Sequence, residues 1–475
     1  MKCILIAPPF SSVYGNFKAI MKYGFLNPPL GLCYLSASLK RAGHEALVLD
    51  CEAQGLNFAK IFEIIQRERP DLIGITATSP ELANALTIAQ ELKARLSTPI
   101  VFGGVHVTIF KDQLLREIPA VDFGVVGEGE ATIVELLEAV DQPQKFPDIQ
   151  GLIFREKDAV RQNPLRPLIP DLDELPFPDR TGQAPELYFR NVPSVGYQTT
   201  AAFMSSRGCP CHCTYCAIDQ IPGWRRVRYR SAPNVVDEIE FLVRELKIKH
   251  ISFNDDVLTM NRSRVYDICQ EIHRRNLHFT WEGLSRADCV DLNLLKAMRA
   301  AGFVRISYGI ESGNPDILKS TCKNETLEQI TEAFRLTRQA GIIARGSLII
   351  GLPFETRRTV EDSFRYISHL EGLDQVIINI LQPYPGTKVR DLAQQGVGGT
   401  RLLGDDLSEL RRFGNASMEV NDLTRNRLIL LQKIGLLRFY LRPRVILRHL
   451  QFYHPKAFLM DGLAFLQSIF SWKAA

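Results

Sequence analysis

Four cysteines fall within eight positions of the stretch SSRGCPCHCTYCAI, residues 205–218. They are Cys209, Cys211, Cys213 and Cys216, in a chain of 475 residues that holds 10 cysteines. Three of them are spaced C-x3-C-x2-C, and three thiolates on one loop can hold three corners of a [4Fe–4S] cluster. The fourth iron then stays open for a substrate. We expect Cys209, Cys213 and Cys216 to be the ligands. Cys211 is interpreted as a non-ligand, because the residue after Cys-Pro would point away from three converging thiolates.

A structural zinc site is the alternative for these thiols. Zinc favours closed tetrahedral sites, typically made from two separated pairs of ligands, and the sequence has no second pair nearby. The first apolar run ends at Pro8-Pro9 and is too short for a signal-peptide core. No run of ~18 uncharged apolar residues is present either. We therefore expect a cytoplasmic protein with reduced thiols, which favours metal ligation or redox chemistry over disulfides.

The chain is too long for one ordinary core, so two or three domains are expected. Its net charge of +4 is unevenly distributed. Residues 425–460 hold eight Lys or Arg and no Asp or Glu, so the rest of the chain is acidic on balance. A basic patch can attract nucleic acid, anionic lipid or an acidic small molecule. The remaining body does not have the composition of a general polyanion binder, and no nucleic-acid partner is expected.

Residues 1–140 alternate short apolar runs with segments of helical periodicity, which predicts a doubly wound parallel sheet. Ligands of such sheets bind beyond the carboxyl ends of the strands. Three loops at that edge supply hydroxyls for hydrogen bonds, and two of them also supply glycines, which let a large ligand lie against the backbone. Tight turns are the alternative role for these glycines. No G-x-G-x-x-G follows the first strand, which argues against a dinucleotide. The candidate residues are Thr78, Ser79, Gly103, Gly104, His106, Gly127, Glu128 and Gly129.

The remaining chain divides into three parts. Residues 141–195 predict a small hairpin followed by a proline-rich linker. Residues 196–390 contain six βα units, too few for a complete eight-stranded barrel but sufficient for a partial one. The cysteine loop follows the first strand of this barrel. Residues 391–475 predict a helical C-terminal region, which Pro443 and Pro455 break into short helices.

The sequence resembles the radical S-adenosylmethionine enzymes. The resemblance rests on CPCHCTYC after a strand, with Tyr215 before the last cysteine, and on the six βα units. The family usually has an aromatic residue where Cys211 stands. The N-terminal segments PPLGLCYLSASLKRAGHEALVLD, GGVHVT and VGEGE are similar to the cobalamin-binding domain of the cobalamin-dependent branch. The resemblance covers residues 1 to about 390. It implies a cobalamin-binding Rossmann-like domain over residues 1–140 and a radical S-adenosylmethionine partial barrel over residues 196–390.

The resemblance also implies cofactors and chemistry. The open iron would chelate S-adenosylmethionine, and one electron from the cluster would break its sulfonium C–S bond to give a 5′-deoxyadenosyl radical. That radical abstracts hydrogen from an unreactive carbon, and methylcobalamin delivers a methyl group to it. A flavodoxin or ferredoxin is the expected electron donor. The protein's part is to orient these groups and exclude water.

Several strand ends of the barrel suit supporting roles. Asp255 and Asp256 could accept from the methionine ammonium, and Arg286 could pair with its carboxylate. Glu311 and Ser312 could reach methionine or ribose groups. Strand-end capping or ordinary ion pairs are the alternative for each. The further candidates are Tyr215, Ile349 as a wall for adenine, and Gln382 and Tyr384 near the barrel mouth.

The cobalamin site departs from a common pattern. The D-x-H-x-x-G sequence, whose histidine coordinates cobalt from below in many corrinoid proteins, is absent. Relatives in this branch bind cobalamin without it, so the resemblance implies a lower face that lacks a histidine ligand. His106 is expected to donate to the corrin periphery or to pack.

The favoured function is methylation of an unactivated carbon of a small metabolite or lipid-like substrate. A non-methylating oxidative cyclase or ring-rearranging enzyme with the same cofactors is a close alternative. A transfer-RNA methylthiotransferase would need a second cluster, for which Cys3, Cys33 and Cys51 do not form an obvious ligand set. A cobalamin sensor or a zinc-dependent binding module is the non-enzymatic alternative. The basic, leucine-rich C-terminal region either packs on the barrel or forms an interfacial surface, which would make the protein peripheral to a membrane.

The ligand assignment gives a first prediction. Anaerobic reconstitution should yield about four irons and four sulfides per chain, the content of a cubane held by three cysteines. Alanine at Cys209, Cys213 or Cys216 should abolish both the cluster and the release of 5′-deoxyadenosine. Cys211→Ala is the matched control and should retain both. Loss of iron in Cys211→Ala together with its retention in Cys213→Ala would show that the ligand set is wrong.

Overall fold

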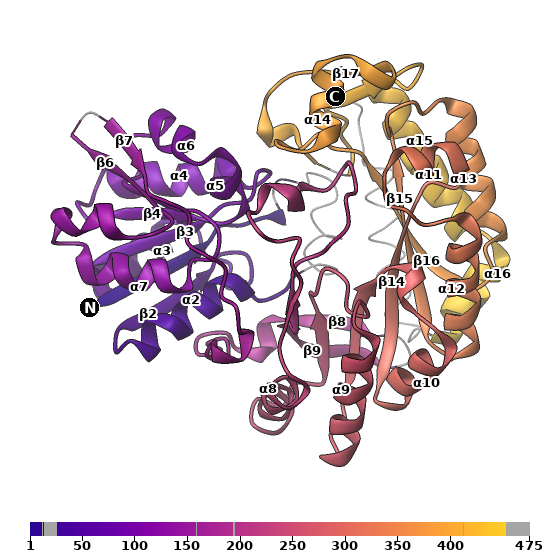
Figure 1. Ribbon diagram of the computed structural model, residues 1–475, viewed down its shortest axis with the longest axis horizontal. Helices are drawn as coiled ribbons and strands as arrows, with labels where there is room; N and C mark the ends of the chain where they lie inside the picture. Colours follow the sequence, from indigo (N-terminus) through magenta and orange to yellow (C-terminus); the bar gives the residue numbers. More distant parts are fainter. Residues whose placement is uncertain (12, 14–25, 158, 193–194, 412, 453–475) are drawn as a thin grey trace. The chain divides into compact units, whose positions relative to one another are not determined.

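The computed structural model describes residues 1–11, 13, 26–157, 159–192, 195–411 and 413–452, and they form two compact units. Of the described residues, the first unit contains those up to Tyr188, together with Gln220–Gly223. The second contains Phe189–Asp219 and the chain from Trp224 onward. Figure 1 labels the elements of both units. Within the described part of the chain, no helix is long and apolar enough to cross a bilayer.

The first unit is a seven-stranded sheet with the order β2-β1-β3-β4-β5-β6-β7. β1 to β5 run parallel, as the sequence predicts, and β6 and β7 form an antiparallel hairpin. The predicted hairpin therefore extends this sheet instead of standing apart. The strands are β1 (Lys2–Ala7), β2 (Glu45–Asp50), β3 (Leu72–Thr76), β4 (Ile100–Gly103), β5 (Phe123–Val125), β6 (Leu152–Glu156) and β7 (Ala159–Gln162).

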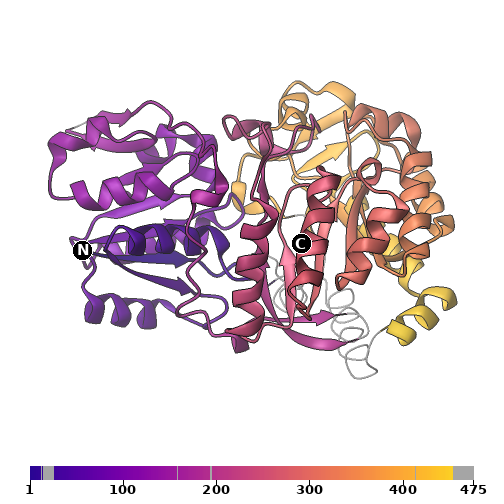
Figure 2. The same cartoon turned by 60° about the horizontal axis from the view of Figure 1, so that its bottom comes forward.

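Helices cover both faces of this sheet, as Figures 1 and 2 show. The period of two along β1 puts Ile4 and Ile6 into one apolar core and Cys3 and Leu5 into the other. The sheet is therefore doubly wound. The helices are α2 (Leu30–Arg41), α3 (Phe58–Glu68), α4 (Leu82–Lys93), α5 (Val105–Phe110), α6 (Asp112–Glu117) and α7 (Glu130–Ala139).

The second unit is a curled sheet with the order β16-β15-β14-β13-β12-β9-β8. Six of its strands run parallel, which confirms the predicted partial barrel. β8, which the sequence pattern did not predict, pairs antiparallel with β9. The strands are β8 (Phe189–Val192), β9 (Gly196–Phe203), β12 (His250–Phe253), β13 (Thr280–Ser285), β14 (Phe303–Glu311), β15 (Ile343–Ile350) and β16 (Leu373–Ile380).

Helices pack on the outer side of the curled sheet and bury one large apolar core. Phe253, Trp281 and Phe303 come from three neighbouring strands, and their rings contact one another in that core. The helices are α8 (Ala232–Arg244), α9 (Arg262–Arg274), α10 (Leu292–Ala300), α11 (Pro315–Ser320), α12 (Leu327–Gln339) and α13 (Arg357–His369).

The C-terminal region is not wholly helical, which corrects the prediction for residues 391–475. After α14 (Lys388–Gln394) come two antiparallel strands, β17 (Thr400–Leu402) and β18 (Met418–Val420). Met418 and Val420 are buried in an apolar cluster with Ile349, so tertiary packing decides the local structure here. α15 (Arg425–Tyr440) and α16 (Pro443–Phe452) follow, and the helix prediction beyond residue 452 lies outside the described residues.

The basic charge of α15 and α16 is largely opposed, contrary to the expectation of an uncompensated interfacial surface. Arg438 pairs with Glu361 at 2.7 Å, Arg427 pairs with Asp422 at 3.1 Å, and Arg448 forms an ion pair with buried Asp374. Arg425 lies 3.7 Å from Glu409. The contacts of Arg438 with α13 and of Arg448 with β16 hold the helices against the barrel, which favours the packing interpretation of this region.

Glu355 lies in the loop after β15 and is completely buried. Its carboxylate accepts from the Gly351 amide at 2.6 Å and the Leu352 amide at 3.1 Å. Its second oxygen has no partner among the described residues. Burial raises the pKa of Glu355 to about 8, although the two amides oppose the shift. The protonated carboxyl group of Glu355 therefore stabilises the fold fully below the ordinary glutamate pKa. This contribution to the free energy of unfolding is lost as the pH rises through about 8.

This gives a second prediction. Glu355→Gln keeps a carbonyl acceptor for the two amides but cannot ionise. The free energy of unfolding of the variant, relative to the wild type, should therefore improve as the pH is raised from about 6 to about 9. Denaturant titration at both values measures the change, and Glu245→Gln, at an exposed position of the same unit, is the control. An equal pH dependence in the wild type and Glu355→Gln would refute the assignment.

Candidate functional site

The cysteine loop begins where β10 (Ser206–Arg207) ends, and a glycine is required at that point. Gly208 has φ +107°, and a Cβ on it would lie 2.5 Å from the carbonyl oxygen of Trp224. The same carbonyl accepts from the Cys209 amide at 3.0 Å. β10 itself pairs with β11 (Arg228–Tyr229). The first cysteine is therefore positioned by backbone contacts.

The middle of the loop is also fixed through its backbone. The Thr214 amide donates to the carbonyl of Thr321 at 2.9 Å, and the Thr214 carbonyl accepts from the Val389 amide at 3.0 Å. A third bond, from the Cys216 amide to the Cys213 carbonyl at 3.1 Å, closes a tight turn. Segments after β14 and β16 thus hold the loop in place.

The three predicted ligand thiols are unpaired cysteines and are partly exposed. Burial raises the pKa of Cys213 to about 11 and also raises the pKa of Cys216. Cys211 does not point away from the other thiols as expected. Its thiol forms a hydrogen bond with Cys209, which, together with nearby Arg286, lowers the pKa of Cys211 to about 6. The exclusion of Cys211 from the ligand set stays a prediction.

The donors of the loop suit an iron–sulfur cluster. Cys209, Cys213 and Cys216 are free of disulfides. A cubane takes each thiolate on a different iron, so three cysteines on one anchored loop can hold three of its corners.

Asp255 and Asp256 follow β12 and support the start of the cysteine loop. Asp255 accepts from the Ser205 amide at 3.2 Å and the Ser205 hydroxyl at 2.7 Å, and it also bonds the Ser206 hydroxyl. Asp256 accepts from the Gly208 amide at 3.2 Å and from the Trp224 indole at 2.9 Å. Burial raises the pKa of Asp256. Both carboxylates are engaged by the protein itself, as the strand-end alternative foresaw.

Glu311 is the last residue of β14 and belongs to a buried network of charges. It has φ +62° and lies at a register shift between β14 and β15. The Lys323 ammonium contacts its carboxylate at 3.2 Å and that of Glu325 at 2.7 Å, and it donates to the Gly309 carbonyl. Burial opposes the charge of Lys323, but the two carboxylates outweigh it and raise the lysine pKa.

Arg286 joins the same network. Its guanidinium pairs with Asp288 at 2.8 Å and approaches Glu325 at 3.8 Å. It also donates to the Lys323 carbonyl at 2.9 Å. Sequence reasoning found Arg286 and Glu311 from their places at strand ends, but it missed Lys323 and Glu325. Those two lie in an irregular loop, and no strand-end spacing marks them.

The remaining barrel candidates divide into two groups. Tyr215 and Ile349 share an apolar cluster, and the Tyr215 hydroxyl bonds Cys213 and Glu311, so both lie beside the cysteine loop. Ser312 faces α13, where its hydroxyl lies 3.2 Å from that of Ser363. Gln382 donates to the carbonyls of residues 411 and 415, and Tyr384 contacts the carbonyl of residue 410. These last three pack against neighbouring segments.

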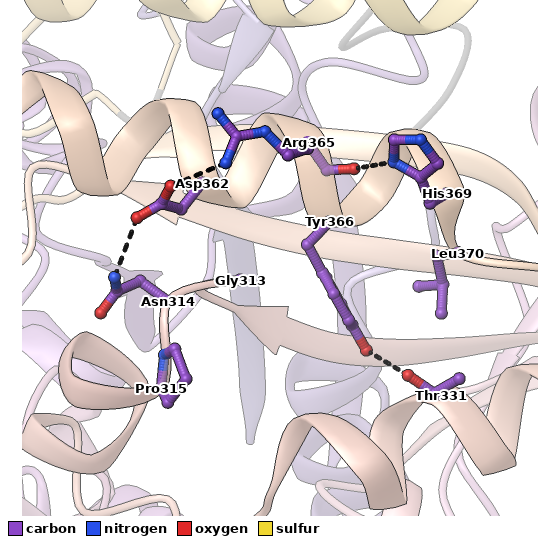
Figure 3. Close-up of a pocket in the computed structure, with 9 residues that line it drawn as sticks. All are labelled: Gly313, Asn314, Pro315, Thr331, Asp362, Arg365, Tyr366, His369 and Leu370. Atoms are coloured by element: carbon purple, nitrogen blue, oxygen red, sulfur yellow. Dashed lines mark hydrogen bonds and ion pairs between the residues drawn. The ribbon is translucent and has the colours of Figure 1, made fainter.

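A cavity of about 460 Å³ lies outside the curled sheet, between α12 and α13 (Figure 3). Its polar lining is internally paired. Asp362 accepts from Asn314 at 3.1 Å and pairs with Arg365 at 3.3 Å, and the Tyr366 hydroxyl lies 2.9 Å from that of Thr331. None of its lining residues belongs to the cysteine loop, so this cavity is separate from the site described here.

The strand-end edge of the first unit leaves bare backbone. A Cβ on Gly103 or Gly127 would meet no atom of the described residues within 4 Å, whereas one on Gly104, with φ +100°, would lie 2.8 Å from the Ala77 carbonyl. Gly127 donates through its amide to Thr108 at 3.1 Å. Open space in front of two strand-end glycines is what a large flat ligand lying against the backbone requires. This edge fits a corrinoid.

His106 is held inside the same unit. Its Nδ1 lies 3.1 Å from the Ser79 hydroxyl, and its ring stacks on Phe110 at 4.4 Å between centroids. Burial lowers the pKa of His106 to about 4, so the imidazole is neutral. The packing alternative for His106 thus has direct structural support.

The other predicted residues of this edge have structural partners. Glu128 accepts from the Ile169 amide at 2.7 Å, Gly129 caps the start of α7, and the Thr78 carbonyl accepts from the Glu81 amide at 3.1 Å. Cys3 and Cys51 lie in separate cores on opposite faces of the sheet. Cys3 and Cys51 therefore do not share a ligand set with Cys33. The sequence likewise shows no obvious second set of cluster ligands.

Comparison with known proteins supports the same division of the chain. A B12 binding domain model matches residues 18–137, and a Radical SAM superfamily model matches residues 203–367. An uncharacterised methyltransferase of Pyrococcus horikoshii is 34% identical over 96% of this chain and 95% of its own length. An anaerobic magnesium-protoporphyrin IX monomethyl ester cyclase of Rubrivivax gelatinosus is 32% identical over 71% of this chain and 61% of its own.

A solved structure shares the fold across both units. The radical S-adenosylmethionine methyltransferase TsrM of Kitasatospora setae, with cobalamin and a [4Fe–4S] cluster bound, superposes with a TM-score of 0.71 at 17% identity. The match covers 93% of this chain and 89% of that one. The anchored cysteine loop, the open glycine edge and the full-length relative lead to one conclusion. The chain belongs to the cobalamin-dependent radical S-adenosylmethionine enzymes, which use a [4Fe–4S] cluster, S-adenosylmethionine and cobalamin.

Proposed function

We propose that this enzyme methylates an unactivated carbon of a small metabolite or lipid-like molecule. The observation that carries the proposal is the relative named as a methyltransferase, which aligns over 96% of the chain and therefore over both units. The open glycine edge of the first unit supports it, because methyl transfer in this family depends on the corrinoid. The structural similarity to TsrM adds support for the fold alone.

We assign the cluster to Cys209, Cys213 and Cys216. Bound together, the cluster, S-adenosylmethionine and cobalamin supply the electron, the radical and the methyl group that no side chain can provide. The protein's task is to place and shield them. Backbone bonds fix the cysteine loop, while Tyr215 and Ile349 form an apolar wall beside it that excludes water. Glu311, held by Lys323, places a carboxylate at the end of β14.

The corrinoid is assigned to the edge formed by Gly103, Gly104 and Gly127. His106 is not assigned as a cobalt ligand. Its ring nitrogen Nδ1 is engaged by Ser79, and the ring is packed against Phe110. Moving the imidazole away from this position would break its hydrogen bond with the Ser79 hydroxyl and would open an apolar cavity beside Phe110.

Oxidative cyclisation is the second candidate. The observation that favours it is the cyclase of Rubrivivax gelatinosus, which is 32% identical over 71% of this chain. Both reactions need the same thiols and the same glycine edge, so these residues serve either one. The two functions differ in the product: methylation adds one methylene unit to the substrate mass, and cyclisation does not.

The third prediction tests this function. The anaerobically reconstituted enzyme, supplied with a chemical reductant and S-adenosyl-L-methionine labelled with deuterium in its methyl group, should transfer the label to a product. Mass spectrometry of candidate metabolites detects it, and Cys213→Ala is the inactive control. Release of 5′-deoxyadenosine without any labelled product would favour the cyclase. A preparation that binds zinc and no iron would overturn both candidates.

The fourth prediction concerns Lys323. Lys323→Met leaves Glu311 buried without its cation and leaves Glu325 with only Arg286, at 3.8 Å, which should destabilise the second unit by about 3–5 kcal/mol. Denaturant titration measures the loss, and Lys323→Arg, which keeps the charge, should recover part of it. The matched control is Lys319→Met, at an exposed position of α11 in the same segment. Equal stability of Lys323→Met and Lys319→Met would show that the network does not stabilise the fold.

A further inference from the structure

α15 carries apolar side chains on two faces, and only one of these faces packs on the barrel. The buried face belongs to the large core of the second unit and contributes Leu428, Leu431, Leu436 and Phe439. The second face has the spacing i, i+4, i+7, i+11, which keeps side chains on one side of a helix. We call it the outer stripe, and it consists of Leu430, Ile434, Leu437 and the C-cap residue Leu441.

The outer stripe is open to solvent. Leu430 is 54% exposed and Leu441 is 61% exposed. Ile434 and Leu437 are partly exposed, and neither belongs to an apolar cluster of the described residues. A helix that is apolar all round is normally buried, and contiguous exposed apolar surface marks interaction sites. The stripe is therefore a surface that a partner should cover.

α16 extends this exposed apolar surface. Leu447 is 62% exposed and Leu450 is 47% exposed, whereas Val445 is buried in the core. Leu447, Leu441 and Leu430 are the three most exposed large apolar side chains of the described residues. Figures 1 and 2 show α15 and α16 on the outer side of the curled sheet, with α16, in yellow, at the edge of the second unit.

Basic side chains border the outer stripe on both sides. Residues three or four apart are neighbours on a helix. Arg427 precedes the first residue of the stripe by three positions, and Arg438 follows its second residue by four, so both lie along one side. Lys433, four positions before Leu437, lies along the other side. Residues 425–452 contain no Asp or Glu.

The carboxylates that face this border come from other segments and form exposed pairs. Asp422 pairs with Arg427 at 3.1 Å, and Glu361 pairs with Arg438 at 2.7 Å. Exposed ion pairs contribute little to stability, so these guanidinium groups can exchange a carboxylate for another anion. Arg444 of α16 is exposed and forms no ion pair within the described part of the chain. Compensated charge alone would not mark this surface as a binding site, but the exposed leucines do.

We propose that the outer stripe lies on an anionic lipid surface. Apolar side chains bordered by Lys and Arg suit the boundary between headgroups and acyl chains, because the leucines enter the apolar layer while the basic groups reach the lipid phosphates. A second copy of the chain is a poorer partner. A two-fold contact through the same stripe would bring the basic borders of both copies together.

The fifth prediction tests lipid binding with the reconstituted holoenzyme. Vesicles of equimolar phosphatidylglycerol and phosphatidylcholine should sediment the wild-type protein. Vesicles of phosphatidylcholine alone should bind it more weakly, and added salt should weaken the binding to the anionic vesicles. Leu430→Ser and Leu441→Ser should each lower the affinity by about fivefold or more, since each removes a leucine from the apolar layer. Arg444→Gln should lower it by about fivefold.

A matched control shows whether the effect is specific to this face. Phe241→Ser removes an apolar side chain that is 41% exposed on α8 of the same unit, and it should bind the vesicles like the wild type. Each variant must retain its iron, its cobalamin and the wild-type melting temperature. Leu447→Ser, on α16, replaces any leucine variant that does not.

The other occupants of the stripe appear as distinct outcomes. Absence of binding to the anionic vesicles, or equal binding to both kinds of vesicle, would overturn the inference. Equal affinity of the wild type and the leucine variants would place the lipid contact elsewhere in the chain, for example in residues 453–475, and would overturn it too. A dimer that sedimentation velocity detects and Leu430→Ser dissociates, without vesicle binding, would assign the stripe to a second copy.

The inference goes beyond the proposed function and can fail independently of it. Vesicle binding is measured without S-adenosylmethionine or reductant. A holoenzyme that transfers methyl groups but binds no vesicles refutes only the lipid contact. A protein that binds vesicles through the stripe but releases no 5′-deoxyadenosine refutes only the proposed function.

Discussion

The geometry of the barrel mouth depends on the contacts of one buried ammonium group, that of Lys323. It lies between the carboxylates of Glu311 and Glu325 and bonds the backbone of β14. Removing three charges from water is expensive and is repaid only when each finds well-placed partners. The chain meets that condition by bringing Arg286 to the same group. The ends of β13 and β14 and the loop after α11 are thereby joined.

This network reaches the cysteines by two routes. Thr321, two residues before the lysine, accepts from the amide of Thr214 in the middle of the cysteine loop. Tyr215 bonds both Glu311 and Cys213. The cysteine loop is therefore positioned by buried charged side chains as well as by its own backbone bonds. Residues that support the proposed ligands help to set their geometry, as the outer residues of metal sites do.

Carboxylates of the barrel are compensated within the protein at two levels of its strands. Near the cysteine loop, Asp255 accepts hydrogen bonds and Glu311 contacts Lys323. Deeper in the sheet, Glu282 forms an ion pair with Arg305. The carboxylates at both levels therefore have partners inside the second unit.

Sequence patterns predicted the parallel strands and the cysteine loop because those signals are local. Apolar runs of the right length mark strands buried on both faces, and the thiol spacing is contained in eight residues. The strand pair β17–β18 was not predicted, because the conformation of Met418 and Val420 depends on packing in an apolar cluster with residues that are distant in the sequence. The role of Lys323 was not predicted for a similar reason, since its partners come from three different segments of the chain. The direction of the Cys211 side chain depends on backbone turns that composition does not record.

β16 is an edge strand of the partial barrel, and it shows how an open sheet is kept from adding further strands. The Tyr440 hydroxyl of α15 both donates to the Val376 carbonyl at 2.9 Å and accepts from its amide at 3.1 Å, and Gln432 donates to the Ile378 carbonyl at 2.7 Å. Side chains of a helix thus occupy hydrogen-bonding groups that a seventh parallel strand, or a strand from another molecule, would need. The sheet therefore ends at β16. Pairing of β16 with a strand from another molecule would first require α15 to detach.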